Sequence, residues 1–234
     1  MASRLPSGPP ESSPPENTRL ALIEAGLRLF GSKGFDAAST REIAAAAKAN
    51  IAAIAYHFGG KAGLRTACAE HVAGLVREIV GPGIVGPIVA AADQSGEPTA
   101  AEAESRLLAA IEAMVGFIVA RADAEPIANF VLREQMERSP AFEIIYASTM
   151  APMHARICAL WAAATGIEAD SVEARLATLS LIGQVIYFRI ARYAVMRRLD
   201  WSEIGPAEAA LISRTIKTNL RAALAAAREQ RHDH

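Results

Sequence analysis

The sequence predicts an all-α fold, and three observations support that prediction. Alanine occurs 51 times among 234 residues, whereas Phe, Trp and Tyr together occur only 13 times, and this composition favours close-packed helices over sheets. Apolar residues recur at helical spacing along most of the chain. The apolar stretches are bounded by residues that typically begin and end helices, and the sequence has no strand-like alternation.

Composition also limits the classes of function. The chain has 24 Lys and Arg against 25 Asp and Glu, so its formal net charge is −1, and any nucleic-acid-binding surface must be a local patch. Its two cysteines, Cys68 and Cys158, are too few for a disulfide scaffold or a structural zinc site. The longest uncharged apolar stretches fall short of the ~20 residues that span a bilayer. We therefore expect a cytoplasmic protein with no membrane partner.

The N-terminal region is expected to hold a tail and then a first helix. Residues 1–16 contain five of the twelve prolines, which predicts a flexible tail. Asn17 or Thr18 is placed to cap a helix. The apolar residues at helical spacing within it are Leu20, Ile23, Leu27 and Phe30. Gly34 is suited to end this helix in a left-handed conformation.

A second, short helix is predicted over residues 40–47. It opens with Ser39 and Glu42, the pattern of a capping box, in which each side chain accepts a hydrogen bond from the other residue's backbone N–H. Lys48 stands in the turn that follows, where a positive φ would strain a residue other than glycine.

Asn50 is placed to cap a third helix, which the Gly59-Gly60 pair ends, and Lys61 begins a longer fourth helix. We assign residues 17–63 to an N-terminal domain and residues 64–234 to a C-terminal domain.

The C-terminal domain is expected to be a second helical body. Gly and Pro are dense over residues 81–98, which predicts a loop. The predicted helices cover residues 99–122, 125–139, 140–165, 171–199 and 206–228, and Thr99 with Glu102 is placed to cap the first of them. Pro152 should kink or split the third of these helices, because it removes a backbone donor.

Three short helices within residues 17–58, with a tight turn before the third, have the arrangement of a helix-turn-helix unit. Ile43, Ile54 and Phe58 supply its apolar anchors. Residues 17–69 carry seven Lys and Arg against three Asp and Glu, a local excess of four positive charges that suits contact with DNA phosphates. The alternative is an alanine-rich mini-bundle with a solvated basic side.

The residues from Thr18 to Leu64 resemble the DNA-binding domain of the TetR family of bacterial transcriptional regulators. The matching positions are Leu22, Ile23, Ala25, Leu29, Phe30, Gly34, Phe35, Ser39, Arg41, Glu42, Ile43, Ala44, Ala47, Asn50, Ile54, His57, Phe58, Lys61 and Leu64. Residues 49–64, together with 180–184 and 188–192, are similar to the family branch with a CecR-type C-terminal region.

The resemblance implies which residues meet the DNA backbone. Ser39, Thr40 and Arg41, at the start of the second helix, are expected to contact phosphates through hydroxyl groups, a guanidinium and the helix dipole. Lys61 and His57 match family positions that also touch the backbone.

The third helix is the recognition helix in this family. Its candidate base-contacting residues are Asn50, Ala52, Ala53 and Tyr56. Because residues 52, 53 and 55 are all alanine, we expect base reading to depend on Asn50 and Tyr56, with alanine methyls against thymine methyls and DNA shape supplying the rest.

The resemblance also implies a dimer interface and an effector cavity in the C-terminal domain. We expect helices 171–199 and 206–228 to pack with their copies as a four-helix bundle about a two-fold axis. The alternative is that the apolar residues of these two helices all belong to the core of a monomer. The candidate ligand-binding residues are Phe117, Phe130, Arg133, His154 and Gln184. For each of them alone, ordinary packing or pairing is the alternative.

These features predict a ligand-responsive transcriptional regulator, most simply a repressor that a small apolar effector releases from a palindromic operator. The alternative is a small-molecule or lipid carrier of the same fold that binds no DNA, for which the capping box, Asn50 and Lys61 would have no use. The sequence has no phosphate-binding glycine loop, no His-Glu-x-x-His and no nucleophile elbow. We therefore expect no catalytic residue, no metal and no cofactor.

Overall fold

The computed structural model describes residues 15–80, 98–121 and 124–232, and its secondary structure over these residues is helical, as predicted. The helices are α1 (Pro15–Lys33), α2 (Thr40–Ala46), α3 (Ala52–Phe58), α4 (Lys61–Val80), α6 (Ala100–Met114), α7 (Glu125–Met136), α8 (Pro140–Ile145), α9 (Ala151–Thr165), α10 (Val172–Ile190), α11 (Arg192–Leu199) and α12 (Pro206–His232). Two π-helical segments, η2 (Val115–Ala120) and η4 (Tyr146–Met150), extend α6 and α8. The tail predicted over residues 1–14 and the loop predicted over residues 81–97 lie outside the described residues.

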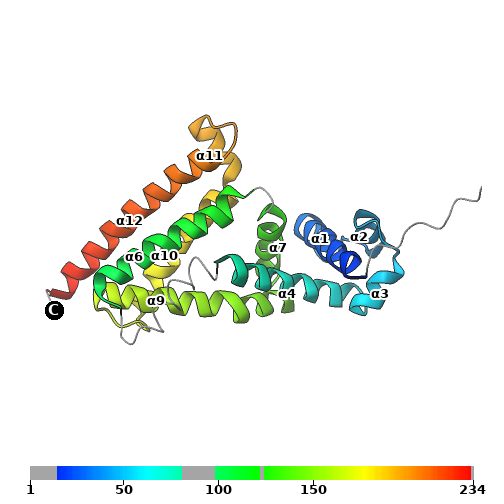
Figure 1. Ribbon diagram of the computed structural model, residues 1–234, viewed down its shortest axis with the longest axis horizontal. Coiled ribbons are helices and arrows are strands. Elements are labelled where there is room, and N and C mark those ends of the chain that lie inside the picture. The colour runs from blue at the N-terminus through cyan, green and yellow to red at the C-terminus, as the bar shows by residue number, and fades with distance from the viewer. Residues whose placement is uncertain (1–14, 81–97, 122–123, 233–234) are drawn as a thin grey trace, which may run out of the picture.

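The helices form two bodies at opposite ends of an elongated molecule (Figure 1). At one end, α1, α2 and α3 lie together, and α4 leads away from them towards the second body. That body contains α6, α9, α10 and the long α12, which ends far from α3. The helix α7 stands beside α1, between the two bodies.

The N-terminal core extends beyond the three short helices. Its buried residues include Phe30 from α1, Ile43 from α2, Ile54 from α3 and Leu64 from α4. The same core also takes in Phe130, Ala141 and Ile145 from α7 and α8. Segments as far apart in the sequence as α1 and α8 thus contribute to one apolar cluster around the helix-turn-helix unit.

The second core lies among α6, η2, α9, α10 and α12. Its larger buried members include Leu107, Met114, Trp161, Val185 and Leu220. The apolar residues of α6 recur at the three- and four-residue spacing that places them on one face of a helix.

The local signals at helix ends are confirmed. Ser39 with Glu42, and Thr99 with Glu102, form complete capping boxes at the starts of α2 and α6. The first helix ends before Gly34, whose φ is 84°.

Lys48 has a φ of 52° in the turn between α2 and α3. Lys48 therefore lies in the left-handed region, which costs energy for any residue that has a Cβ atom.

The predicted cap of the first helix is wrong, because α1 begins at Pro15 and not after Asn17 or Thr18. Proline suits the first turn of a helix, since the N–H that it lacks would be unpaired there. The predicted split near Pro152 is confirmed: the π-helical η4 ends two residues before it.

The continuous helix predicted over residues 171–199 is also wrong. The chain bends by 77° at Ala191 and forms two helices, α10 and α11. Arg192, directly after the bend, donates hydrogen bonds to the carbonyl oxygens of Val119 (3.0 Å) and Ile204 (3.4 Å). These acceptors hold α11 against η2 and the start of α12, which a straight helix could not reach.

No single helix in the described part of the chain has both the length and the apolar composition needed to cross a bilayer; α10 and α11 meet that test only as a bent pair.

Candidate nucleic-acid interface

The helix-turn-helix unit is held together by its apolar anchors. Ile43 and Ile54 are buried, and Phe58 is half-buried with the guanidinium of Arg19 over its ring, 5.4 Å from the centroid. The side-chain oxygen of Asn50 accepts a hydrogen bond from the N–H of Ala52 at 2.9 Å. Asn50 therefore satisfies a free donor in the first turn of α3, although Ile51 stands between it and the helix.

The exposed side of α3 presents few polar groups. Asn50, Ala52 and Tyr56 are exposed, and the side chain of Tyr56 is the most open of them, at 83%. Ala53 is half-buried, because it packs against the N-terminal core. His57 is also half-buried, and its ring lies 4.9 Å from that of Tyr56 in an edge-to-face arrangement.

At the start of α2, the groups expected to meet phosphate are partly engaged. The hydroxyl of Ser39 donates to a carboxylate oxygen of Glu42 (2.9 Å) and accepts from the N–H of the same residue (3.2 Å). The amine of Lys33 lies 2.7 Å from the other oxygen of that carboxylate. These contacts, the one with Lys33 first, lower the pKa of Glu42 to about 2.

The two neighbouring residues, Thr40 and Arg41, differ in exposure. Thr40 is half-buried, whereas Arg41 is exposed and makes no hydrogen bond or ion pair with any residue that the structure describes. Arg41 is thus the group at this helix start whose charge is available to an incoming phosphate.

Lys61 lies at the first position of α4, where it is partly tied down. Its amine donates to the carbonyl oxygen of Asp36 at 3.2 Å and sits 4.5 Å from the centre of the Phe35 ring. The charge is therefore held close to the loop between α1 and α2.

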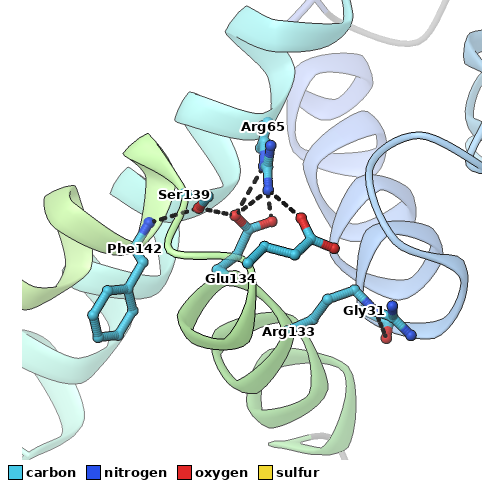
Figure 2. Close-up of polar contacts among 7 residues, drawn as sticks. Gly31, Arg65, Arg133, Glu134, Ser139 and Phe142 are labelled. Atoms are coloured by element: carbon cyan, nitrogen blue, oxygen red, sulfur yellow. Dashed lines mark hydrogen bonds and ion pairs between the residues drawn. The ribbon is translucent and has the colours of Figure 1, made fainter.

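A polar cluster connects α4 to α7, and we call Arg65, Glu134, Glu137 and Ser139 the α4–α7 junction (Figure 2). The guanidinium of Arg65 lies 2.7 Å from the carboxylates of both Glu134 and Glu137. The hydroxyl of Ser139 donates to Glu134 and accepts from the N–H of Phe142, so the junction also caps α8.

A second contact joins α7 to the end of α1. Arg133 donates to the carbonyl oxygen of Gly31 at 3.2 Å (Figure 2) and to that of Ser32 at 3.3 Å. Both acceptors lie in the last turn of α1. The helices touch closely here, because a Cβ placed on Gly31 would lie 2.9 Å from the backbone nitrogen of Phe130. Arg133 therefore binds carbonyl groups that the helix end leaves free.

The C-terminal core contains a small apolar cavity of about 10 Å³, roughly the space of one water molecule. The residues that line it are Leu107, Ala110, Ile111, Met114, Ile157, Leu181, Ile182 and Leu220. A molecule larger than water could occupy this cavity only if its lining side chains moved.

The five candidate ligand-binding residues do not meet at this cavity. Phe117 is buried in the C-terminal core, whereas Phe130 is buried in the N-terminal core. Arg133 binds the end of α1, and Gln184 accepts a hydrogen bond from the side-chain amide of Asn219 at 2.8 Å. His154 is half-buried, and this burial lowers its pKa.

None of the residues that line the cavity is among the candidate ligand-binding residues of the sequence analysis. Within the described residues, no group of three His, Cys, Asp or Glu side chains is placed to hold a metal ion. Both cysteines are buried and unpaired with each other, and burial raises the pKa of the Cys68 thiol.

An apolar stripe that is exposed in the described part of the chain runs along α10. Its exposed members at helical spacing are Val172, Leu176, Leu179, Tyr187 and Ile190. Large apolar side chains aligned on the outside of a helix indicate a surface that packs against something else.

Comparison with known proteins agrees with these features. Residues 22–68 match the family described as bacterial regulatory proteins, tetR family, and residues 103–227 match the C-terminal domain of the HTH-type transcriptional dual regulator CecR. The chain is 31% identical to the HTH-type transcriptional dual regulator CecR of Shigella flexneri, over 88% of this chain and 90% of that protein. It is 48% identical over 48 residues to the probable HTH-type transcriptional regulator YttP of Bacillus subtilis, which is 20% of this chain and 23% of that protein.

Solved structures share the fold at low sequence identity. A TetR-family transcriptional regulator from Streptomyces coelicolor has a TM-score of 0.62 at 18% identity, with 92% of each chain covered. A TetR-like transcriptional regulator from Rhodococcus sp. RHA1 has a TM-score of 0.59 at 17% identity, covering 92% of this chain and 99% of that one. AibR, solved in complex with isovaleryl coenzyme A and operator DNA, has a TM-score of 0.57 at 17% identity, covering 86% of this chain and 96% of that one. From the two matched domains and the full-length relative, we conclude that the chain belongs to the TetR family of DNA-binding transcriptional regulators, with a CecR-type C-terminal domain, and is not an enzyme.

Proposed function

We propose that the protein is a dimeric, ligand-responsive repressor that binds a palindromic operator in the cytoplasm. The observation that carries this proposal is the exposed face of α3, where Tyr56 projects from a helix otherwise lined by alanine. A helix with such small side chains can lie close to the base edges of a major groove.

The proposed DNA contacts divide into two groups. Arg41 and Lys61, with the hydroxyls of Ser39 and Thr40 and the ring of His57, would meet phosphates and fix the position of the domain. Asn50, Ala52, Ala53 and Tyr56 would face the bases, and the half-buried Ala53 would contribute less than its neighbours.

The stripe on α10 supports a dimer. We propose that Leu176 and Leu179 pack against their copies on a second subunit, together with the adjacent face of α12. Two copies of α3 roughly 34–36 Å apart would then enter successive major grooves on one side of the duplex.

The effector response is proposed to act through α4 and α7. An effector that opens the space around the small cavity would shift α6 and α9, and the α4–α7 junction would carry this shift to the DNA-binding end. A coupling free energy of about 1–3 kcal/mol would weaken operator binding about 5–150-fold.

The carrier alternative has less support. The chain has the capping box of α2 and the exposed side chains of Arg41 and Tyr56, for which a carrier would have no use. The relative that matches most of the chain is named a transcriptional regulator. Because that relative is named a dual regulator, the experiment below tests both DNA binding and whether the protein represses or activates transcription.

The experiment begins with selection of bound sequences from a random duplex pool, followed by gel shifts with the selected duplex. We expect Tyr56→Ala to reduce the affinity about 5–100-fold, whereas Met136→Ala, which truncates a side chain of matching exposure (85% against 83%) in α7, leaves it unchanged. A reporter driven by the same site then shows whether transcription falls or rises. Failure to select any sequence at low salt, or equal affinities for the two variants, would contradict the proposal.

A further inference from the structure

One buried cation in the C-terminal body has no adequate partner among the residues that the structure describes. The side chain of Arg189 in α10 is only 6% exposed, and its Nη2 nitrogen makes no hydrogen bond to any residue that the structure describes. The nearest carboxylate oxygen, on Glu125, is 4.0 Å from that nitrogen, which is beyond hydrogen-bond reach. A buried guanidinium with an unmet donor is costly and calls for an explanation.

Two other arginines of this body have hydrogen-bond acceptors. Arg192 donates to the carbonyl oxygens of Val119 and Ile204, and Arg228 donates to Ala164 and to the carboxylate of Glu104. A purely structural arginine thus finds acceptors in this fold. Arg189 is the exception among these three.

Arg189 shares a buried face of α10 with the apolar cavity. Ile182 lines the cavity, Val185 is buried, and Arg189 lies seven residues beyond Ile182, about 10.5 Å along the helix axis. The π-helical η2, which begins directly after the cavity residue Met114, packs against both α10 and α12. Single π-helical turns of this kind are frequent at functional sites.

We propose that Arg189 binds the carboxylate of the effector, which is an apolar monocarboxylic acid whose chain extends along α10 towards Ile182. This inference rests on the ligand response proposed above and names the chemical class of the ligand. The carboxylate would accept the hydrogen bonds that Glu125 is too distant to accept, and would take the place of Glu125 as the counter-ion.

The local charges favour one added negative charge. Burial lowers the pKa of Arg189, Glu125 opposes this shift, and the nearby positive charge of Arg192 adds to it. Among the described residues, the charges that act on the pKa of Arg189 are thus the Glu125 carboxylate and the Arg192 guanidinium. The side chain of Glu125 is 66% exposed, so it can move into water at little cost when a ligand arrives.

The position of Glu125 links binding to the DNA-binding end. Glu125 is the first residue of α7, and the same helix carries Arg133 and Glu134, which contact α1 and α4. Release of Glu125 from Arg189 would free the start of α7, and the other end of that helix holds the DNA-binding body.

The test is calorimetric titration of the full chain with butanoate, octanoate, dodecanoate and 3-phenylpropanoate, each paired with the alcohol of the same carbon skeleton. We expect at least one acid to bind about tenfold or more tightly than its alcohol. Arg189→Gln should bring the two affinities within about twofold, and Glu125→Gln should tighten binding of the acid, because it removes the competing carboxylate. Arg175→Gln, in which an arginine of the same helix is 60% exposed, is the matched control and should change neither affinity.

Circular dichroism establishes whether Arg189→Gln folds. If it does not fold, the outcome is decided by the ratio of the acid and alcohol affinities of the wild type and by the effect of Glu125→Gln on the affinity for the acid. Equal binding of acids and alcohols, no acid binding at about 10 mM, or no gain in Glu125→Gln would overturn the inference. Operator binding measured without any acid tests the proposed function separately, so either result can fail while the other holds.

Discussion

The guanidinium of Arg65 in α4 lies 2.7 Å from the carboxylate of Glu134 in α7, and the two residues are 69 positions apart in the sequence. The Glu134 side chain is only 1% exposed, and Arg65 also stacks over the ring of Phe35 at 4.5 Å. This ion pair ties the helix that leaves the DNA-binding domain to the helix that lies between the two bodies.

Removal of Arg65 is expected to destabilise the fold, because it leaves a buried carboxylate without its counter-ion. Arg65→Met should lower the free energy of unfolding by about 3–5 kcal/mol in urea titrations. Arg175→Met, which breaks an exposed pair with Asp170, should cost only about 0–1 kcal/mol. Similar losses in both variants would mean that the α4–α7 junction contributes no more than a surface pair.

The contact between α1 and α7 depends on the absence of a side chain at Gly31. Gly31→Ala should destabilise the protein by about 1–3 kcal/mol, because its Cβ would lie 2.9 Å from the backbone nitrogen of Phe130. Gly74→Ala in α4 is the control: nothing lies within 4 Å of its Cβ, so it should stabilise the helix by about 0.5–1 kcal/mol. Thermal unfolding that ranks the two variants in the opposite order would exclude a close approach of α1 and α7.

In the strained turn before the recognition helix, glycine should give a more stable protein than alanine, which is the reverse of their order in a helix. Lys48 is exposed and has a φ of 52°, so glycine removes a left-handed penalty that alanine retains. Lys48→Gly should be more stable than Lys48→Ala by about 0.5–1 kcal/mol in denaturant titrations. If alanine proves the more stable residue, the turn does not hold a left-handed conformation in solution.

The capping box of α2 predicts a stability that falls in acid. The pKa of Glu42 is about 2 in the folded protein, below its ordinary value of 4.5. The contribution of the Glu42 carboxylate to the free energy of unfolding is therefore complete above the unfolded-state pKa and is lost as the pH falls from 4.5 towards 2. Glu42→Gln should flatten this part of the pH profile of the unfolding free energy.

The control for that profile is Glu24→Gln, which removes an exposed carboxylate that makes no ion pair among the described residues. A profile for Glu42→Gln that still falls as steeply as that of the control would assign the acid sensitivity to other groups.

A charge placed in the stripe of α10 should separate the proposed dimer. Leu176→Glu would bury an unpaired carboxylate between two subunits, so light scattering should give the mass of a single 24.7 kDa chain in place of twice that mass. Leu20→Glu changes an exposed leucine in α1 and should leave the dimer intact. A wild-type protein that already has the mass of one chain would remove the dimer from the proposal.

Sequence reasoning found the features that depend on neighbouring residues. The capping boxes at Ser39 and Thr99 and the left-handed Gly34 were predicted, because each involves hydrogen bonds or backbone angles within a few positions. The predicted start of α1 is three or four residues late, because Asn17 and Thr18 are suitable caps but Pro15 already fits the first turn.

The features that sequence reasoning missed depend on distant partners. No glycine or proline marks the bend at Ala191, which follows from the acceptors that Arg192 finds on two other segments. The sequence predicts Arg133 as a ligand residue because it is polar within an apolar helix, and Phe130 because an aromatic side chain can line an apolar cavity, but the structure places both against α1.

The two apolar cores alternate along the chain. The helix α6 belongs to the C-terminal core, whereas α7 and α8, which follow it in the sequence, contribute Phe130, Ala141 and Ile145 to the N-terminal core. No single cut separates the two halves, so a hybrid regulator made by grafting a foreign sensor after residue 63 would expose Phe30, which packs against Phe130. A working hybrid has to carry its own equivalent of α7, or transplant this one together with the DNA-binding half.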